Sequence, residues 1–352
     1  MWYYLPLTYE VFNIDGSDMA TIYEVSELAG VSLATVSRVM NKSSKVSDKT
    51  RIKVEIAMKE LGYRPNSIAQ SLASSRSNSI GILVSELHGP FFGQMMAGIE
   101  SELRTAGKHV IITTGHSEED KEKEGIDFLI GRNCDALIIH VEAVSDQYLI
   151  ELSKGKTPIF LISRHVEALL DNCISLDNEL GGYIATRALI EQGHKDIAYI
   201  AGPQFKADAR DRLAGHQRAL AQYNMPFYEN LLYIGDFKET GGSEGLKHFI
   251  DNKLSFSAVV CANDEMASGT IKYAREHNIG LPHDLSIIGY DNIIFANYLY
   301  PKLTTIDNPI NEMGHMAAKL VLKRIYKIKE LAIKHVFEPS LIPRDSVIPF
   351  QQ

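Results

Sequence analysis

The chain has 352 residues, of which 45% are hydrophobic and 23% charged, a composition typical of a soluble folded protein with two or three domains. No apolar run reaches the roughly 18 residues that a membrane-spanning helix needs, and residues 1–18 lack the basic start of a secretory signal. We therefore expect a cytoplasmic protein without a membrane partner. Its three cysteines have no CxxC spacing and are expected to be buried, reduced thiols: Cys134, Cys173 and Cys261.

Charge is distributed unevenly along the chain. Residues 19–78 contain nine Lys and Arg against five Asp and Glu, a net charge of +4. Because the net charge of the whole chain is −8, the remaining residues carry a net charge of −12. A basic segment attached to an acidic body suits the binding of a polyanion by that segment. A solvated surface can give the same balance, so the motifs inside the segment decide between the two readings.

The basic segment begins with the pattern of a helix, a tight turn and a second helix. Thr21 and Glu24 have the spacing of a capping box, which marks a helix start. Gly30 can adopt a left-handed turn, and Ser32 can cap the next helix. This pattern predicts a helix-turn-helix, although two short amphipathic helices could also form nothing more than a small helical core.

In a helix-turn-helix, the second helix enters the major groove of DNA. We expect Leu33, Ala34 and Arg38 to face the bases, because arginine can bond a guanine edge and small apolar groups can contact thymine methyls. Contacts on phosphates, which position the head, are expected from Thr35, Ser37 and Asn41. Thr21, Tyr23 and Ser32 are further expected DNA contacts.

A third helix is predicted over residues 48–61, ending at Gly62. A short hinge helix follows in residues 65–78, and a helix of about two turns is marginal in water on its own. The apolar side chains expected to face the core of the head are Val25, Leu28 and Ala29 of the first helix and Ile52, Ile56 and Met58 of the third.

Residues 19–25, 29–41, 61–66 and 69–72 closely resemble the N-terminal region of the LacI/GalR repressor family. The resemblance implies a homodimer that reads a palindromic operator at the nucleoid. It also implies a hinge helix in which Asn66 contacts DNA and Leu72 wedges into a minor-groove step, where unstacking is offset by added contact. Residues 1–18 depart from the family pattern and form an N-terminal extension.

After residue 78, apolar runs alternate with helical stretches, which predicts parallel sheets built from βαβ units. The expected strands are 79–84, 109–112, 136–140, 158–162, 197–200, 258–261 and 285–288. By resemblance they form a core similar to periplasmic binding proteins. We predict an α/β protein with a three-helix helix-turn-helix head (19–64), a hinge helix and linker (65–78) and a two-subdomain core (79–347). The N-subdomain covers about 79–178 and 310–340, and the C-subdomain about 179–309.

Open α/β sheets bind ligands at the carboxyl ends of their strands, so the effector cleft is expected there. A carboxylate and a guanidinium can bond sugar hydroxyls, an amide can donate and accept, and an aromatic ring can stack on a sugar face. Four candidates have an alternative role: Asp291 as a helix cap, the two phenylalanines as core, and Arg212 on an exposed helix face, with Arg210 as its rival for the ligand. The candidates are Phe91, Phe92, Arg164, Asp208, Arg212, Asn263 and Asp291, with Asp264 expected to cap the next helix.

Within the family, residues 31–35, 132–140, 173–178 and 208–213 look most like the galactose repressors. Galactose is therefore the expected effector, with another sugar, a nucleoside or a purine as alternatives. The purine-type members have an arginine where this chain has Lys206 and a threonine where it has Asp208.

Two other classes of protein fit the sequence less well. A periplasmic sugar-binding protein needs a signal peptide and has no helix-turn-helix. An enzyme would have to use isolated groups such as His116, His140, His165 and Asp177, and no GxSxG, HExxH or Walker motif accompanies them. We expect a repressor that needs no cofactor or metal.

Overall fold

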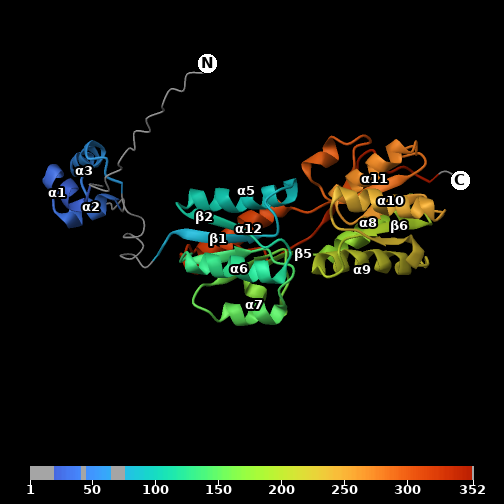
Figure 1. The fold of residues 1–352 in the computed structure, drawn as a ribbon, viewed down its shortest axis with the longest axis horizontal. Coiled ribbons are helices and arrows are strands. Elements are labelled where there is room, and N and C mark those ends of the chain that lie inside the picture. The colour runs from blue at the N-terminus through green and yellow to red at the C-terminus, as the bar shows by residue number, and fades with distance from the viewer. Residues whose placement is uncertain (1–19, 41–44, 65–75, 351–352) are drawn as a thin grey trace, which may run out of the picture. The chain divides into compact units, whose positions relative to one another are not determined.

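The computed structural model describes residues 20–40, 45–64 and 76–350 (Figure 1). It divides the chain into two compact units, residues 1–77 and 78–352. We call the described residues 20–64 the head and residues 78–350 the core. Three of the expected DNA contacts, Asn41, Asn66 and Leu72, lie outside the described residues, as does the extension 1–18.

The head contains three helices, α1 (Ile22–Ala29), α2 (Leu33–Met40) and α3 (Asp48–Glu60). The expected capping box is present: the Glu24 amide donates to Thr21 Oγ1 at 3.3 Å, and the Thr21 amide donates to Glu24 Oε2 at 2.6 Å. Gly30 follows α1 with φ +63°, so the chain turns through the left-handed region that glycine tolerates. The sequence therefore sets the angle at which α2 leaves α1.

The core of the head differs from the expected one. Ile52 and Ile56 are 55% and 58% exposed, and Leu28 is 48% exposed. The buried stripe of α3 consists instead of Val54 and Ala57. Residues 52 and 56 lie about 200° around the helix from residue 54, given about 100° per residue, so burying the smaller pair turns the isoleucines outward. Val25, Ala29, Val36 and Val39 complete the buried cluster, with Met58 packed against it.

The core contains two six-stranded sheets. The first has the order β11-β5-β4-β3-β1-β2, with every pair parallel. Its strands are β1 (Ser79–Val84), β2 (His109–Thr114), β3 (Ala136–Ile139), β4 (Ile159–Ile162), β5 (Cys173–Leu176) and β11 (Val336–Phe337). The helices of this N-subdomain are α5 (Pro90–Thr105), α6 (Glu119–Gly131), α7 (Asp146–Ser153), η1 (Glu167–Asn172) and α12 (Ile310–Ile325), the last packed against α5.

The second sheet has the order β12-β10-β9-β8-β6-β7 and is parallel except for β12, which pairs antiparallel with β10. Its strands are β6 (Ile197–Ala201), β7 (Leu232–Ile234), β8 (Ala258–Cys261), β9 (Ser286–Asp291), β10 (Thr304–Asp307) and β12 (Ser340–Ile342). The helices of this C-subdomain are α8 (Asn178–Glu191), α9 (Ala207–Gln222), α10 (Glu239–Asp251), α11 (Asp264–Glu276), η2 (Glu229–Leu231) and η3 (Ile294–Asn297).

The chain passes between the subdomains three times: between β5 and α8, between β10 and α12, and between β11 and β12. The first and third passages lie side by side, because the Asp177 amide donates to the Phe337 carbonyl at 3.0 Å. The third passage was not expected. It returns residues 340–350 to the C-subdomain, where Ser346 Oγ donates to the Ile287 carbonyl at 2.6 Å.

All seven expected strands are present, and each is extended or shortened by a few residues at most. The three cysteines are free and buried, and burial raises the pKa of the Cys261 thiol to about 12. No helix in the described ranges is long and apolar enough to cross a membrane.

Candidate functional site

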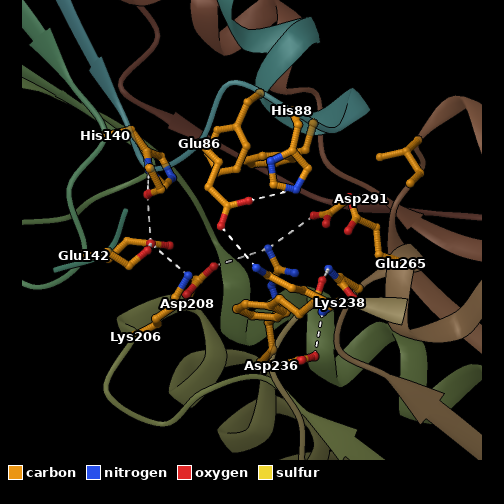
Figure 2. A pocket seen from close by; sticks show the side chains of 18 residues that line it. Glu86, His88, His140, Glu142, Lys206, Asp208, Asp236, Lys238, Glu265 and Asp291 are labelled. Atoms are coloured by element: carbon orange, nitrogen blue, oxygen red, sulfur yellow. Dashed lines mark hydrogen bonds and ion pairs between the residues drawn. The ribbon is translucent and has the colours of Figure 1, made fainter. Parts of the chain in front are cut away.

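A pocket lies where the carboxyl ends of both sheets face each other (Figure 2). Its cavity of about 90 Å³ has room for about six water molecules, which is the order of size of one monosaccharide. Both subdomains contribute to the lining: Ser85, Glu86, His88, Phe91, Phe92, Ser117, His140 and Glu142 from the first, and Lys206, Asp208, Arg212, Asp236, Phe237, Lys238, Asn263, Glu265, Asp291 and Ile293 from the second.

The floor of the pocket is an ion pair between Arg212 of α9 and Asp291 at the end of β9. Arg212 Nη2 lies 3.3 Å from Asp291 Oδ1, and the guanidinium stacks 3.7 Å from the centre of the Tyr290 ring. Arg212 Nη1 also donates to the Ala262 carbonyl at 2.6 Å. Because the guanidinium is only 3% exposed and held on several sides, it is a rigid donor aimed at the cavity.

Both the ionised form and the backbone conformation of Asp291 are unfavourable. Burial raises the pKa of its carboxyl to about 6. The charge of Arg212 and a hydrogen bond from the Asn308 side-chain amide act in the opposite direction. Its backbone φ is +103°, a region that costs a residue with a Cβ about 1–3 kcal/mol. Arg212 and Asn308 both contact Oδ1 of the carboxylate. Hydroxyl groups of a ligand in the pocket can donate to a carboxylate placed in this way.

The helix cap expected at Asp264 is instead formed by its neighbour Asn263. Asn263, not Asp264, is the N-cap of α11: its Oδ1 accepts from the Met266 amide at 2.9 Å. Asp264 is buried behind the pocket, where it accepts from the Ile293 amide and the Thr305 hydroxyl. Asn263 still lines the pocket, but its Nδ2 donates to the Phe237 carbonyl at 2.8 Å. Much of its bonding capacity is therefore already used.

An aromatic wall faces the floor from the N-subdomain. The rings of Phe91 and Phe92 meet edge to face with centroids 5.3 Å apart, and Phe92 lies 5.4 Å from His140 in the same geometry. Both phenylalanines are partly buried and line the cavity at the start of α5. Such a wall suits the apolar face of a sugar ring opposite hydrogen-bonding groups.

Two ion pairs join the subdomains across the pocket (Figure 2). Lys206 Nζ lies 2.8 Å from Glu142 Oε2, with both side chains nearly buried, and Lys238 Nζ lies 3.4 Å from Glu86 Oε1. Glu142 also accepts from Ser85 and Ser117. Burial would raise the pKa of Glu142, but the charges of His140 and Lys206 and the hydrogen bonds from Lys206 and Ser117 lower it to about 2.

Arg164 does not line the pocket, which corrects its expected place. Its guanidinium donates to the carbonyls of Val141, Glu142 and Val144 and pairs with Asp146 at 2.7 Å. From the other side, the buried Glu122 accepts from the amides of residues 142–144. Arg164 thus holds the loop that carries Glu142, and the Arg164 guanidinium is already bonded to that loop and to Asp146.

The remaining expected residues of α9 separate clearly. Asp208 lines the pocket, 3.8 Å from Arg212 Nη2. Arg210 is exposed and donates to the carbonyls of Gln204 and Phe205 instead. The helical repeat explains why Arg210 lies outside the pocket. Residues 208 and 212 are one turn apart on the same face of α9, whereas residue 210 lies about 200° away.

The head presents its expected base-reading residues to solvent. Leu33, Ala34 and Arg38 are exposed on α2, and Ala34 and Arg38 lie one turn apart on one face. Tyr23 is 68% exposed. Of the positioning residues, Thr21 and Ser32 are exposed, while Thr35 and Ser37 are partly buried. Ser32 caps α2, because its Oγ accepts from the Thr35 amide at 3.2 Å. The Thr35 hydroxyl lies 2.9 Å from the same oxygen.

Several lining residues were missed by the sequence reasoning. Ser85 and His140 directly follow β1 and β3, so the strand-end rule that selected Asp291 could have selected them too. Glu142 and Lys206 lie further along their loops, where a sequence pattern does not show that they meet. No group of His, Cys, Asp and Glu in the described part of the chain could hold a metal ion.

Charge on the pocket lining favours a neutral ligand. Six carboxylates line it, against three Lys and Arg, and the three cations all have carboxylate partners. A phosphorylated ligand would meet this excess of negative charge, whereas hydroxyl groups can bond both signs.

The fold and these two sites define a DNA-binding transcription regulator with a ligand-binding core. Residues 21–66 match the bacterial regulatory proteins of the lacI family, and residues 186–347 match a periplasmic binding protein-like domain. The chain is 39% identical over 329 residues to the HTH-type transcriptional regulator GalR of Salmonella typhimurium, covering 94% of this chain and 96% of that one.

Two further similarities extend the comparison. The HTH-type transcriptional repressor PurR of Photorhabdus laumondii is 35% identical over 337 residues, with 94% and 97% coverage. A crystal structure of the lac repressor dimer bound to operator and the anti-inducer ONPF superposes with a TM-score of 0.83 at 30% identity, covering 94% of this chain and 99% of that one. This chain belongs to the LacI family of bacterial regulatory proteins.

Proposed function

We propose that this chain is a dimeric repressor that binds a palindromic operator through its head and releases it when a neutral sugar, D-galactose, occupies the pocket. The observation that carries the proposal is the floor of the pocket: a buried arginine paired with a buried carboxylate whose pKa is raised, opposite an aromatic wall. Similarity to GalR over nearly the whole chain supports galactose among the neutral sugars.

Each residue has an assigned part. Asp291 and Arg212 bond ring hydroxyls, Asp208 and Asn263 contribute at the margin, and Phe91 and Phe92 pack against the apolar face of the ring. In the head, Leu33, Ala34 and Arg38 read bases, while Thr21, Tyr23, Ser32, Thr35 and Ser37 position α2 on the backbone. The hinge contacts proposed for Asn66 and Leu72, and that of Asn41, belong to the same interface. The similar lac repressor is a dimer on its operator, and two heads are needed to read two half-sites.

The test begins by selecting an operator from random duplexes with the purified full-length chain at one stated salt concentration, because phosphate contacts make affinity depend on salt. Fluorescence anisotropy of that duplex is then followed while D-galactose, D-glucose, D-ribose or hypoxanthine is added. Release by D-galactose, and weaker release by its C4 epimer D-glucose, is expected. If only another compound releases the operator, that compound replaces galactose as the proposed effector. Failure to select any duplex would contradict the proposal that the chain is a repressor.

A further inference from the structure

Two asparagines lie where the chain passes between the subdomains, and each bonds one of the two charged residues at the pocket floor. Asn178, the first residue of α8 directly after the first passage, accepts from Arg212 Nε at 2.9 Å. Asn308, in the second passage, donates to Asp291 Oδ1 at 3.0 Å. Because Arg212 and Asp291 are themselves paired at 3.3 Å, an unbroken line of contacts runs from one passage through the floor to the other.

All four side chains in this line are buried. Asn178 and Asn308 are 9% and 5% exposed, and Arg212 and Asp291 are 3% and 8% exposed. Water cannot easily replace a bond that breaks there, and hydrogen bonds to charged groups are among the stronger ones. An arrangement of the passages that turns either asparagine away from the floor is therefore disfavoured.

Asn178 makes two further hydrogen bonds, one to the strand before the passage and one to β9. Its Nδ2 donates to the Leu176 carbonyl at the end of β5, at 3.4 Å, and its Oδ1 accepts from the Tyr290 hydroxyl at 3.3 Å. The neighbouring Asp177 amide bonds the third passage. A shift of the Arg212 side chain would therefore change contacts at two of the three passages.

Asn308 is held more loosely. Its Oδ1 is buried and has no hydrogen-bond partner among the described residues, so within that part of the chain the amide is fixed only through the Nδ2 bond to Asp291. When Asp291 turns toward another donor, the Asn308 side chain loses its one hydrogen bond among the described residues. Neither asparagine lines the pocket, so both act on a ligand only through the floor.

We propose that Asn178 and Asn308 are positioning residues that transmit occupancy of the pocket to the passages between the subdomains. The proposal rests on the proposed function, in which a sugar bonds Arg212 and Asp291. Sugar hydroxyls compete for the same carboxylate oxygen and guanidinium, which changes the bonds left for the two asparagines. Backbone dihedrals in the passages then adjust, and the subdomains change their relative angle.

The first test measures coupling. Operator affinity is determined with and without saturating D-galactose, and galactose affinity with and without operator, for the full-length chain and for Asn178→Ala and Asn308→Ala. The two ratios must agree, because coupling is reciprocal. We expect the coupling factor to fall about tenfold in each variant, while each binding constant measured alone changes less than about threefold.

A matched control is Asn172→Ala. Asn172 is a partly buried asparagine whose Nδ2 also donates to a backbone carbonyl, that of Ile159 at 3.1 Å, but it lies outside all three passages. A general loss of stability would affect the control as well, whereas loss of coupling would not. A coupling factor that is unchanged in both passage variants overturns the proposal.

The second test needs no ligand. Spin labels at Lys156→Cys and Lys247→Cys report the distance between the subdomains, since both positions are exposed and the native cysteines are buried. The distance distribution should shift or broaden in Asn178→Ala and Asn308→Ala but not in Asn172→Ala. Unchanged distances overturn the proposal. A native chain that does not bind galactose contradicts the proposed effector, and the distances still decide the role of the asparagines.

Discussion

Replacing Asp291 with asparagine should make the protein more stable and at the same time insensitive to its effector. The carboxyl group has a pKa of about 6 in the folded protein against an ordinary value of 3.8. Because the folded pKa is raised, the stability contribution of this group is fully present below about pH 4 and is lost as the pH rises through 6. The environment thus opposes the charged form that the proposed site uses.

The size of the effect follows from the shift. A difference of about two pKa units corresponds to about 3 kcal/mol at pH 7. Asparagine imitates the neutral carboxyl in size and avoids this cost, and it also tolerates the positive φ of +103° at this position better than most residues. Loss of one charged acceptor for a sugar hydroxyl costs about 1.5–3 kcal/mol, or roughly ten- to 150-fold in affinity.

Urea unfolding at pH 7.5 and pH 4 measures the first effect, and calorimetric titration with D-galactose measures the second. We expect Asp291→Asn to be more stable than the native chain at pH 7.5, with most of the difference gone at pH 4. The exposed Asp251→Asn should change neither quantity. A less stable Asp291→Asn variant at pH 7.5, or one that binds galactose normally, would refute the reasoning.

Three other changes test separate parts of the account. Arg38→Ala should weaken operator binding by about 1–3 kcal/mol and relax discrimination at one base position; competition with single-base operator variants measures this, and an unchanged base preference contradicts the role of α2. Glu142→Gln should lose up to about 3 kcal/mol in urea unfolding at pH 7, because the lowered pKa of about 2 means that the ionised group stabilises the fold above pH 4.5 and ceases to do so toward pH 2; equal stability at pH 7 would count against the ion pair. Gly182→Ala should cost about 1–3 kcal/mol, since its Cβ would lie 2.0 Å from the Arg212 carbonyl oxygen, whereas Gly131→Ala, in open space, should cost almost nothing; thermal melting compares the two.

Seven of the twelve strands in the described residues, and the pocket floor, could be predicted from the sequence because both follow local rules. Buried parallel strands are nearly continuous apolar runs, and the strand-end rule pointed to Asp291 before the sheet was known. Helical period then separates Arg212 from Arg210. The capping box and Gly30 likewise fix the start and end of α1 by short-range bonds.

What could not be predicted depends on contacts between distant segments. Glu142 and Lys206 are far apart in sequence and meet only because the subdomains face each other. Arg164 looked like a ligand-binding arginine because no sequence pattern shows that nearby carbonyls already occupy it. In the head, Ile52 and Ile56 were placed inside on hydrophobicity alone, but the helices approach closely over the smaller Val54 and Ala57.

The central claim is that a sugar bound at the pocket floor releases the head from DNA. The most direct measurement is a titration of D-galactose into the preformed complex of the full-length chain with its selected operator, followed by anisotropy beside the Asp291→Asn variant. The account predicts that the native complex dissociates and the variant complex remains bound at the same sugar concentrations. Equal dissociation of both complexes, or dissociation of neither, would contradict it.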